Sequence, residues 1–193
     1  MKYSDQFIDW LVEEGYTHCF FVAGGNIMHL LDSVRTRMVC VPFVHEVAAT
    51  IAAEYFTATA DPERGKAFVL VTAGPGFTNT LTGVASAWME SRELLVVGGQ
   101  VKKSDLSRGD VRQRGIQEID GATMAESVCK RVLRVEEPVS RSILIDAIRE
   151  GSSPRKGPVF VEVCLDAQAA APVAEDQGAA PSRRESDVPR VGS

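Results

Sequence analysis

One carboxylate in this sequence stands in an almost wholly apolar run. Glu46 lies within residues 41–49 (VPFVHEVAA), where a strand is expected to end and a helix to begin. Burial among such side chains disfavours the charged form, so we expect a raised pKa and a carboxyl group that can hold or share a proton. The alternative is an ordinary acid at a helix N-terminus, favoured by the helix dipole. We expect the adjacent His45 to position or pack rather than act as a base, because consecutive residues near a helix start point in different directions.

A glycine-rich turn, Gly-Pro-Gly at 74–76, follows an apolar run and precedes a helical pattern. Such a turn can present backbone N–H groups to an anion, or it can simply close a tight strand-to-helix turn. A nicotinamide or flavin site of the Rossmann type is a third alternative. It is disfavoured because Asn79 occupies the third glycine position and the next strand ends at Gln100, where a ribose-binding acid would be expected.

The elements that must position these residues alternate along the chain. Apolar runs predict strands, and apolar residues three and four apart predict the helices between them, the first capped by Ser4. The predicted strands are 17–22, 38–43, 67–72, 94–97, 131–135 and 159–164. This order predicts an α/β fold: a three-layer, doubly wound, mostly parallel sheet with helices on both faces and a ligand crevice at the carboxyl ends of the strands.

Composition indicates how many domains the chain forms and in which environment it works. The 193 residues are 45% hydrophobic and 24% charged, so we expect one domain over residues 1–166 and a disordered Ala/Pro/Gly/charged tail over 167–193. A net charge of −5 argues against nucleic acid, and no apolar run reaches membrane-spanning length. The four cysteines are widely spaced and are expected to be structural thiols. With no visible signal peptide, we expect a cytoplasmic protein.

Several blocks in the same order resemble one family. They are His45-Glu46, then residues 69–79 (VLVTAGPGFTN), 87–91 (AWMES) and 96–100 (VVGGQ). These resemble the pyrimidine-binding (PYR) domain of thiamine-diphosphate enzymes. The Gln117-Glu118 pair in the following loop makes the chain most similar to the acetolactate synthase branch.

The resemblance implies a role for each matching residue. The family's glutamate, here Glu46, hydrogen-bonds the ring N1′ of the cofactor's aminopyrimidine and promotes its imino tautomer, which suits a carboxyl group in an apolar setting. The resemblance places four further residues at the cofactor: Thr72, Asn79, Gly24 and Gly25. It places three at the substrate pocket: Ala23, which stands where proline is usual, His45 and Gln117. A structural role remains open for two of them, since Asn79 could brace its own helix and Gln117 could be a surface residue.

The resemblance also implies a missing half. Family members hold the diphosphate and Mg²⁺ on a second (PP) domain through a Gly-Asp-Gly sequence, whereas the Gly-Asp of this chain, Gly109-Asp110, is followed by Val111. We therefore expect weak thiamine diphosphate binding by the chain alone, with metal and diphosphate held by a PP-domain subunit in an α2β2-type hetero-oligomer. We favour a natural subunit of a split enzyme over a fragment of a longer synthase.

The sequence leaves three candidate functions. The leading one is decarboxylation of a 2-oxo acid with ligation of the product to an acceptor, as in acetolactate synthase. The second is decarboxylation alone, as in the two-subunit sulfopyruvate and phosphonopyruvate decarboxylases. The third, from another class, is a non-catalytic interaction module that kept the PYR fold. A desolvated Glu46 argues against this module, which would have no use for it.

Overall fold

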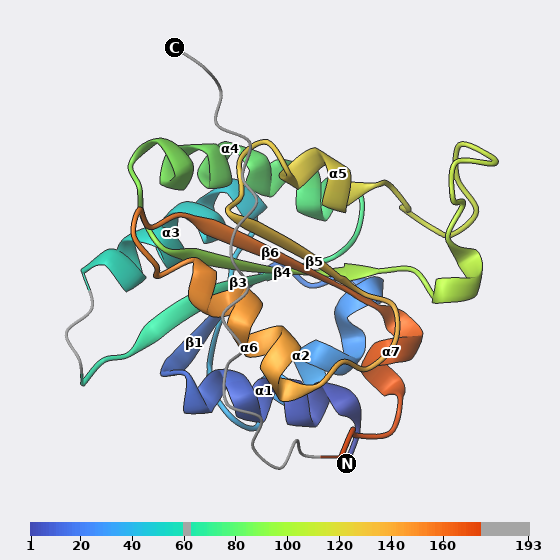
Figure 1. Ribbon diagram of the computed structural model, residues 1–193, viewed down its shortest axis with the longest axis horizontal. Helices are drawn as coiled ribbons and strands as arrows, with labels where there is room; N and C mark the ends of the chain where they lie inside the picture. Colours follow the sequence, from blue (N-terminus) through green and yellow to red (C-terminus); the bar gives the residue numbers. More distant parts are fainter. Residues whose placement is uncertain (60–62, 175–193) are drawn as a thin grey trace.

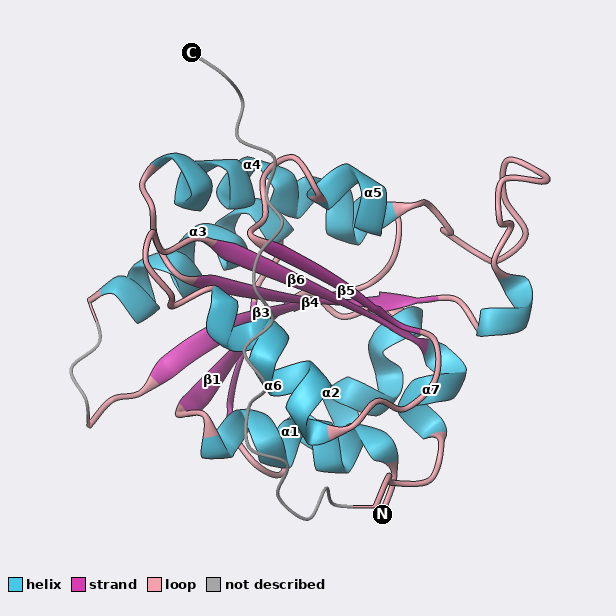
Figure 2. Ribbon diagram, viewed as in Figure 1, coloured by secondary structure: helices cyan, strands magenta, loops and turns pink. Residues whose placement is uncertain are grey.

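The computed structural model describes residues 1–59 and 63–174, and its centre is a six-stranded sheet. The strand order is β2-β1-β3-β4-β6-β5, and every neighbouring pair is parallel. Figures 1 and 2 show helices on both faces of this sheet, so the predicted doubly wound α/β fold is confirmed. The strands are β1 (Tyr16–Phe21), β2 (Val39–Pro42), β3 (Lys66–Val71), β4 (Leu94–Gln100), β5 (Arg131–Val135) and β6 (Pro158–Cys164).

Three of the four inner strands, β3, β4 and β6, are buried along almost their whole length. Their sequences are continuous apolar runs because helices cover both faces of a parallel sheet. The edge strand β2 is partly exposed and ends at Pro42, which has no N–H to offer a further strand.

The helices divide into two layers, each with its own apolar core. One layer packs α1 (Tyr3–Glu13), α2 (Met28–Val34), α6 (Arg141–Glu150) and α7 (Leu165–Ala169) against the sheet. The other contains α3 (Glu46–Ala58), α4 (Pro75–Met89) and α5 (Gly121–Ala125), which lie above the sheet in Figure 1. Two short 3-10 helices, η1 (Gly25–Ile27) and η2 (Lys103–Asp105), lie in loops. No helix among the described residues has the length and apolar character needed to span a membrane.

The first helix begins earlier than the sequence suggested. Lys2 is its N-cap residue, and the Asp5 carboxylate accepts a hydrogen bond from the Lys2 N–H at 2.7 Å. Ser4, the expected cap, is instead fully buried and accepts a hydrogen bond from the Ser33 hydroxyl at 3.0 Å. The predicted cap was therefore wrong by two positions: the helix begins at Tyr3, and Asp5 at its third position accepts the N–H of the cap residue Lys2.

The end of the domain also differs from expectation. The boundary placed after residue 166 falls inside α7, in which Gln168 is fully buried. Beyond α7, the N–H and carbonyl of Val173 both hydrogen-bond the Gln6 side chain, at 2.9 Å each. The packed chain thus continues past the expected boundary, and the expected tail from residue 175 onward lies outside the described residues.

The strand order reverses direction between β1 and β3. From β1 the chain moves outward to β2, and it then returns to the other side of β1 to form β3 and β4. In doubly wound sheets, a crevice opens at such a switch point beyond the carboxyl ends of the strands. The segments that follow Phe21 and Val71 must therefore border this crevice.

Candidate functional site

The turns after β1 and β3 meet in close contact at the switch point. A Cβ atom placed on Gly24 would lie 2.4 Å from the Cβ of Thr72, so only glycine fits there. The next turn residue, Asn26, donates its backbone N–H to the Thr72 hydroxyl at 3.2 Å. Gly24 and Thr72, both predicted at the cofactor, are thus packed together at this point.

Glu46 enters the same place from the start of α3, just beyond β2. Its carboxylate accepts a hydrogen bond from the Asn79 side-chain amide at 2.9 Å. A Cβ on Gly76 would lie 3.7 Å from the other Glu46 oxygen and 2.8 Å from the Thr72 methyl group. The helices α3 and α4 therefore hold the Glu46 carboxylate and the Asn79 amide beside the backbone of Gly76.

The expected full burial of Glu46 is wrong for this chain alone, because the side chain is half-buried. Much of the apolar run that surrounds it in sequence faces outward instead of covering it. Val44 is 100% exposed, and Ala48 is exposed as well. Consecutive residues at a helix start point in different directions. Val44 and Ala48 are therefore close to Glu46 in sequence but do not cover its side chain.

His45 has a local structural contact. It is the N-cap residue of α3, and its Nδ1 accepts the Val47 N–H at 3.2 Å. The ring is exposed. His45 thus fixes the first turn of the helix that begins with Glu46, in keeping with the expected positioning role.

The loop that follows β4 returns across the crevice and reaches Gly74. Gly74 has a φ of +64°, which favours glycine, and a Cβ there would lie 2.5 Å from the Gln117 carbonyl oxygen. The adjacent Ile116 carbonyl accepts the Asn26 side-chain N–H at 3.3 Å. Gln117, expected at the substrate pocket, is exposed and borders the turn that opens α4.

Two predicted residues lie at the rim. Ala23 and Gly25 are exposed in the turn after β1. No described atom comes within 4 Å of a Cβ placed on Gly25, in contrast to its neighbour Gly24. The structure thus brings Gly24, Thr72, Glu46 and Asn79 together. Ala23 and Gly25 lie outside this group, with exposed surfaces at the rim of the crevice.

The sequence analysis missed Asn26, which connects four segments. Besides its contacts with Thr72 and Ile116, its carbonyl accepts a hydrogen bond from the Gln168 side chain of α7 at 2.7 Å. Its place directly after Gly24-Gly25 could have marked it. Gln168 carried no such signal, because it fell in the expected tail.

A second polar group lies at the ends of β4, β5 and β6. Gln100 is fully buried and donates to the Glu162 carboxylate at 3.0 Å and to the Ile119 carbonyl at 2.9 Å. Glu162 also pairs with Arg134, which in turn pairs with Asp120. Burial raises the pKa of Glu162, and the Arg134 guanidinium opposes that shift.

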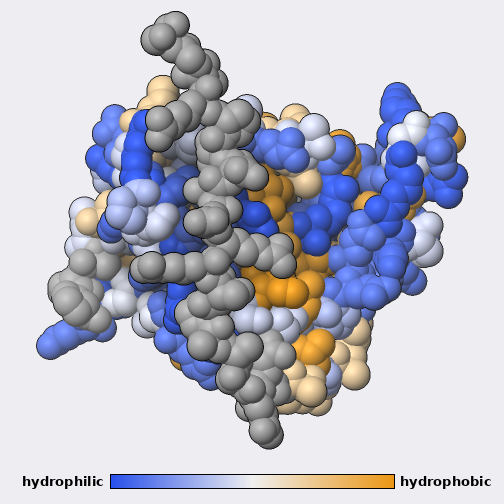
Figure 3. All heavy atoms as spheres, in the orientation of Figure 1, coloured by the Kyte–Doolittle hydropathy of each residue, from blue (hydrophilic) through white to orange (hydrophobic). Residues whose placement is uncertain are grey.

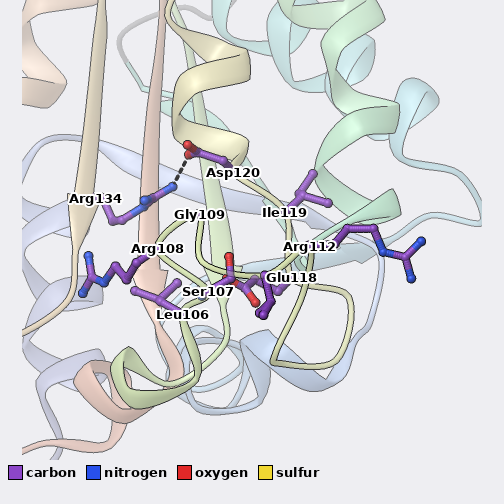
Figure 4. Close-up of a pocket in the computed structure, with 10 residues that line it drawn as sticks. Leu106, Ser107, Arg108, Gly109, Arg112, Glu118, Ile119, Asp120 and Arg134 are labelled. Atoms are coloured by element: carbon purple, nitrogen blue, oxygen red, sulfur yellow. Dashed lines mark hydrogen bonds and ion pairs between the residues drawn. The ribbon is translucent and has the colours of Figure 1, made fainter.

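This group borders a pocket of about 480 Å³ beside the loop, shown in Figure 4. Its lining combines charged side chains with the apolar side chains of Leu106, Val111 and Ile119. The Arg134 to Asp120 ion pair crosses one side of it (Figure 4). Glu118 lines this pocket but Gln117 does not, and the pocket shares no lining residue with the Glu46 crevice. Within the described residues, no three His, Cys, Asp or Glu side chains are grouped so as to hold a metal ion.

Comparisons with known proteins agree with this geometry. Residues 1–124 match the family described as thiamine pyrophosphate enzyme, N-terminal TPP binding domain. The chain is 35% identical over 153 residues to 2-hydroxyacyl-CoA lyase 2 of Caenorhabditis elegans, covering 76% of this chain and 22% of that protein. It is 33% identical over 159 residues to acetolactate synthase isozyme 3 large subunit of Escherichia coli, covering 81% and 26%.

The chain therefore spans about a quarter of the length of the curated relatives it matches. The matched segment contains the crevice between β1 and β3 together with Glu46 and Asn79. It includes the strand-end glycines that the resemblance identified. The chain belongs to the N-terminal, pyrimidine-binding domain family of thiamine pyrophosphate enzymes, in its acetolactate synthase-like branch.

Proposed function

We propose that this chain supplies the PYR half of a thiamine-diphosphate-dependent active site that decarboxylates a 2-oxo acid and ligates the product to an acceptor. The observation that carries the proposal is the Asn79 to Glu46 hydrogen bond of 2.9 Å at the switch-point crevice. A carboxylate held by an amide beside glycine backbone is a specific arrangement, and the family places its activating glutamate at the matching position.

The donor set fits the edge of an aminopyrimidine. When bound, thiamine diphosphate supplies the electron sink for decarboxylation. Glu46 would hold a proton at one carboxyl oxygen and share it with a ring nitrogen, while the Asn79 amide keeps the other oxygen in place. Because Gly76 and Gly24 carry no side chains, Thr72 packs directly against both turns and holds them together at the edge of the crevice.

Substrate contacts would come from the rim of the crevice. Gln117 borders Gly74, while Ala23 and His45 are exposed on the turns after β1 and β2. Ligation is favoured over simple decarboxylation because the relatives include several acetolactate synthases. Simple decarboxylation remains the second candidate function.

A PP-domain partner is part of this proposal, and the outer face of α3 supports it. Helix α3 buries two polar residues, Thr50 and Glu54, while apolar side chains are exposed on another side of it. Ile51 is 39% exposed and Tyr55 is 49% exposed on that helix, with Val44 fully exposed just before it. Exposed apolar side chains gathered in one place are typical of interaction sites, so we infer a partner surface here.

We assign Mg²⁺ and the diphosphate to that partner, in an α2β2-type hetero-oligomer whose sites lie between PYR and PP domains. Burial of the α3 start by the partner would also complete the desolvation of Glu46, which is half-buried here. All four cysteines are free thiols, which suits the reducing cytoplasm that we propose as its location.

Calorimetric titration tests the partner requirement. Thiamine diphosphate with Mg²⁺ is titrated into the full chain alone and into the chain mixed with a candidate PP-domain protein. We expect micromolar binding only in the mixture. Micromolar binding by the chain alone would contradict the split site, whereas binding without any turnover of 2-oxo acids in the mixture would favour a non-catalytic module.

Product analysis separates the two catalytic alternatives. The assembled enzyme is given a 2-oxo acid with and without a second carbonyl compound, and carbon dioxide release is compared with ligated product. Ligation predicts a product that contains both carbon units. Aldehyde as the sole organic product would instead assign simple decarboxylation.

A further inference from the structure

The loop over residues 107–118 is charged and projects from the body of the protein, yet its two ends are held together. Figure 3 shows this loop as the hydrophilic extension on one side of the molecule. At its base, the Ser107 backbone N–H donates a hydrogen bond to the Glu118 carboxylate. A compact loop with closed ends is typical of segments that carry function.

Glu118 closes this loop mainly through backbone N–H groups, with a further hydrogen bond from the Ser107 side chain. One carboxylate oxygen accepts from Ser107, and the other accepts the N–H groups of Arg114 at 2.8 Å and Gly115 at 3.2 Å. The residue is only 7% exposed although the loop around it is largely exposed. Charge-assisted hydrogen bonds of this kind are about twice as strong as neutral ones.

Two of the three arginines that line the adjacent pocket pair with carboxylates other than Glu118. Arg108 forms a bidentate pair with Glu136, and Arg134 pairs with Glu162 and Asp120. The negative charge of Glu118 is therefore directed at the loop backbone, although Figure 4 shows it among the residues that line the pocket.

The residues just before Glu118 form the crevice side of the loop. Gly115 packs against Val101 so closely that a Cβ would lie 2.3 Å from a Val101 methyl carbon. Gln117 has a φ of +61°, a conformation uncommon for a residue with a side chain, and its carbonyl oxygen abuts Gly74. Contacts from the surrounding residues must therefore stabilise this backbone conformation of Gln117.

We propose that Glu118 is a positioning residue that ties the loop ends together and so presents Gln117 to the crevice in a preformed geometry. This rests on the proposed function, in which Gln117 borders the substrate. Glu118 itself faces backbone N–H groups and would not touch substrate. Preformed walls lower the conformational cost of binding, which explains a buried charge in an otherwise exposed loop.

Residue-resolved amide exchange by NMR on the full chain tests the proposal. Glu118→Gln keeps the shape but removes the charge and one acceptor oxygen. We expect exchange to accelerate roughly 10- to 100-fold at the amides of Ser107, Arg114 and Gly115, since a hydrogen bond to a charged group is being weakened. The amides of β4 should exchange as before, which shows that the sheet stays folded.

Glu126→Gln is the matched control. Glu126 is an exposed carboxylate just after α5, and its replacement should leave the three loop amides unchanged. Unchanged protection in Glu118→Gln, or acceleration spread equally over the loop and β4, would overturn the proposal.

The pH profile of the unsubstituted chain supplies a second readout that a purely steric role would not produce. Burial acts to raise the pKa of Glu118, but hydrogen bonds from the N–H groups of Arg114, Ser107 and Gly115 and from the Ser107 side chain outweigh it and lower the pKa. Four charged groups border the same pocket: Arg108 and Arg112 of the loop, Asp120, and Arg134 of β5.

Protection of the three amides, relative to intrinsic exchange rates, should be constant near neutral pH and fall as the carboxylate protonates at acid pH. This loss should be missing in Glu118→Gln, and its presence there would contradict the proposal. Neither result depends on thiamine diphosphate. A failure of the Glu118 proposal would therefore leave the proposed role of Glu46 unaffected, and that role is tested by separate experiments.

Discussion

The Asn79 side chain on α4 donates a hydrogen bond of 2.9 Å to the Glu46 carboxylate on α3. The two residues are far apart in sequence, so the bond depends on how α3 and α4 pack over the sheet. Thr50, one turn along α3, supports the same helix start by donating its hydroxyl to the Glu46 carbonyl at 2.7 Å. Backbone and side chain of Glu46 are thus each held by a separate contact.

Removing the amide tests whether this contact positions Glu46. Asn79→Ala should lower kcat/KM of the assembled enzyme by roughly 10- to 100-fold, because a hydrogen bond to a charged group is worth about 1.5–3 kcal/mol. The same variant should change the unfolding free energy by only about 1 kcal/mol, since Asn79 is half-buried. Steady-state kinetics and chemical denaturation provide the two numbers.

Thr78→Ala is the control on the same helix. Thr78 is half-buried, and its hydroxyl contacts only its own helix start, at 3.4 Å from the Pro75 carbonyl. Near-normal kinetics are expected. Equal losses in both variants would mean that α4 itself, and not the Asn79 amide, is responsible.

Adjacent glycines give a sharp steric comparison. Gly24→Ala would place a Cβ 2.4 Å from the Thr72 Cβ, so the turn after β1 must shift. We expect a loss of about 1–3 kcal/mol in unfolding free energy, typical of overpacking. Gly25→Ala meets no described atom within 4 Å and should stay within about 0.5 kcal/mol of the unsubstituted chain. Urea titrations of both variants check this, and similar losses at both positions would show that the turns are not packed as described.

The cap of α1 provides a pH-dependent prediction. Burial acts to raise the pKa of Asp5, but hydrogen bonds from the Lys2 N–H and the Ser33 hydroxyl and the charge of Arg37 lower it overall. A carboxylate whose folded pKa is lowered stabilises the fold above its unfolded pKa, and this contribution is lost as pH falls through the folded pKa.

Asp5→Asn should therefore destabilise the chain by about 1 kcal/mol at neutral pH, and the difference should shrink as the pH drops below about 4. Glu13→Gln, on the same helix with its side chain 57% exposed, should show a smaller difference. Thermal unfolding across pH measures both. A difference for Asp5→Asn that persists at acid pH would argue that the shape of Asp5, rather than its charge, supports the helix.

Much of the fold could be predicted because its signals are local and repeated. The run 67–72 is apolar at every position but the last, and it became the central strand β3 and the buried Thr72 that follows. Strand-end glycines such as Gly24 and Gly74 marked the side of the sheet where the crevice opens. Alternation of strands and helices then left few arrangements to choose from.

What escaped prediction depends on contacts between distant segments. The apolar residues beside Glu46 in sequence predicted that they would bury its carboxylate, but Val44 and Ala48 are exposed to solvent. Helix α7 has tail-like composition, and it is fixed by Gln168, which bonds the Asn26 carbonyl far away in sequence. Ser4 is a common capping residue, but the cap position is Lys2, whose N–H donates a hydrogen bond to the Asp5 carboxylate.

The most direct test of the central claim measures the exchange of the thiazolium C2 proton of thiamine diphosphate for deuterium. The measurement is made by NMR on the chain assembled with its PP-domain partner and Mg²⁺, using the unsubstituted chain and Glu46→Gln. If Glu46 is the activating carboxylate, the substitution should slow exchange by at least about 100-fold, within the range of general acid–base catalysis, while the fold is unchanged. Exchange as fast in Glu46→Gln as in the unsubstituted assembly would contradict the account.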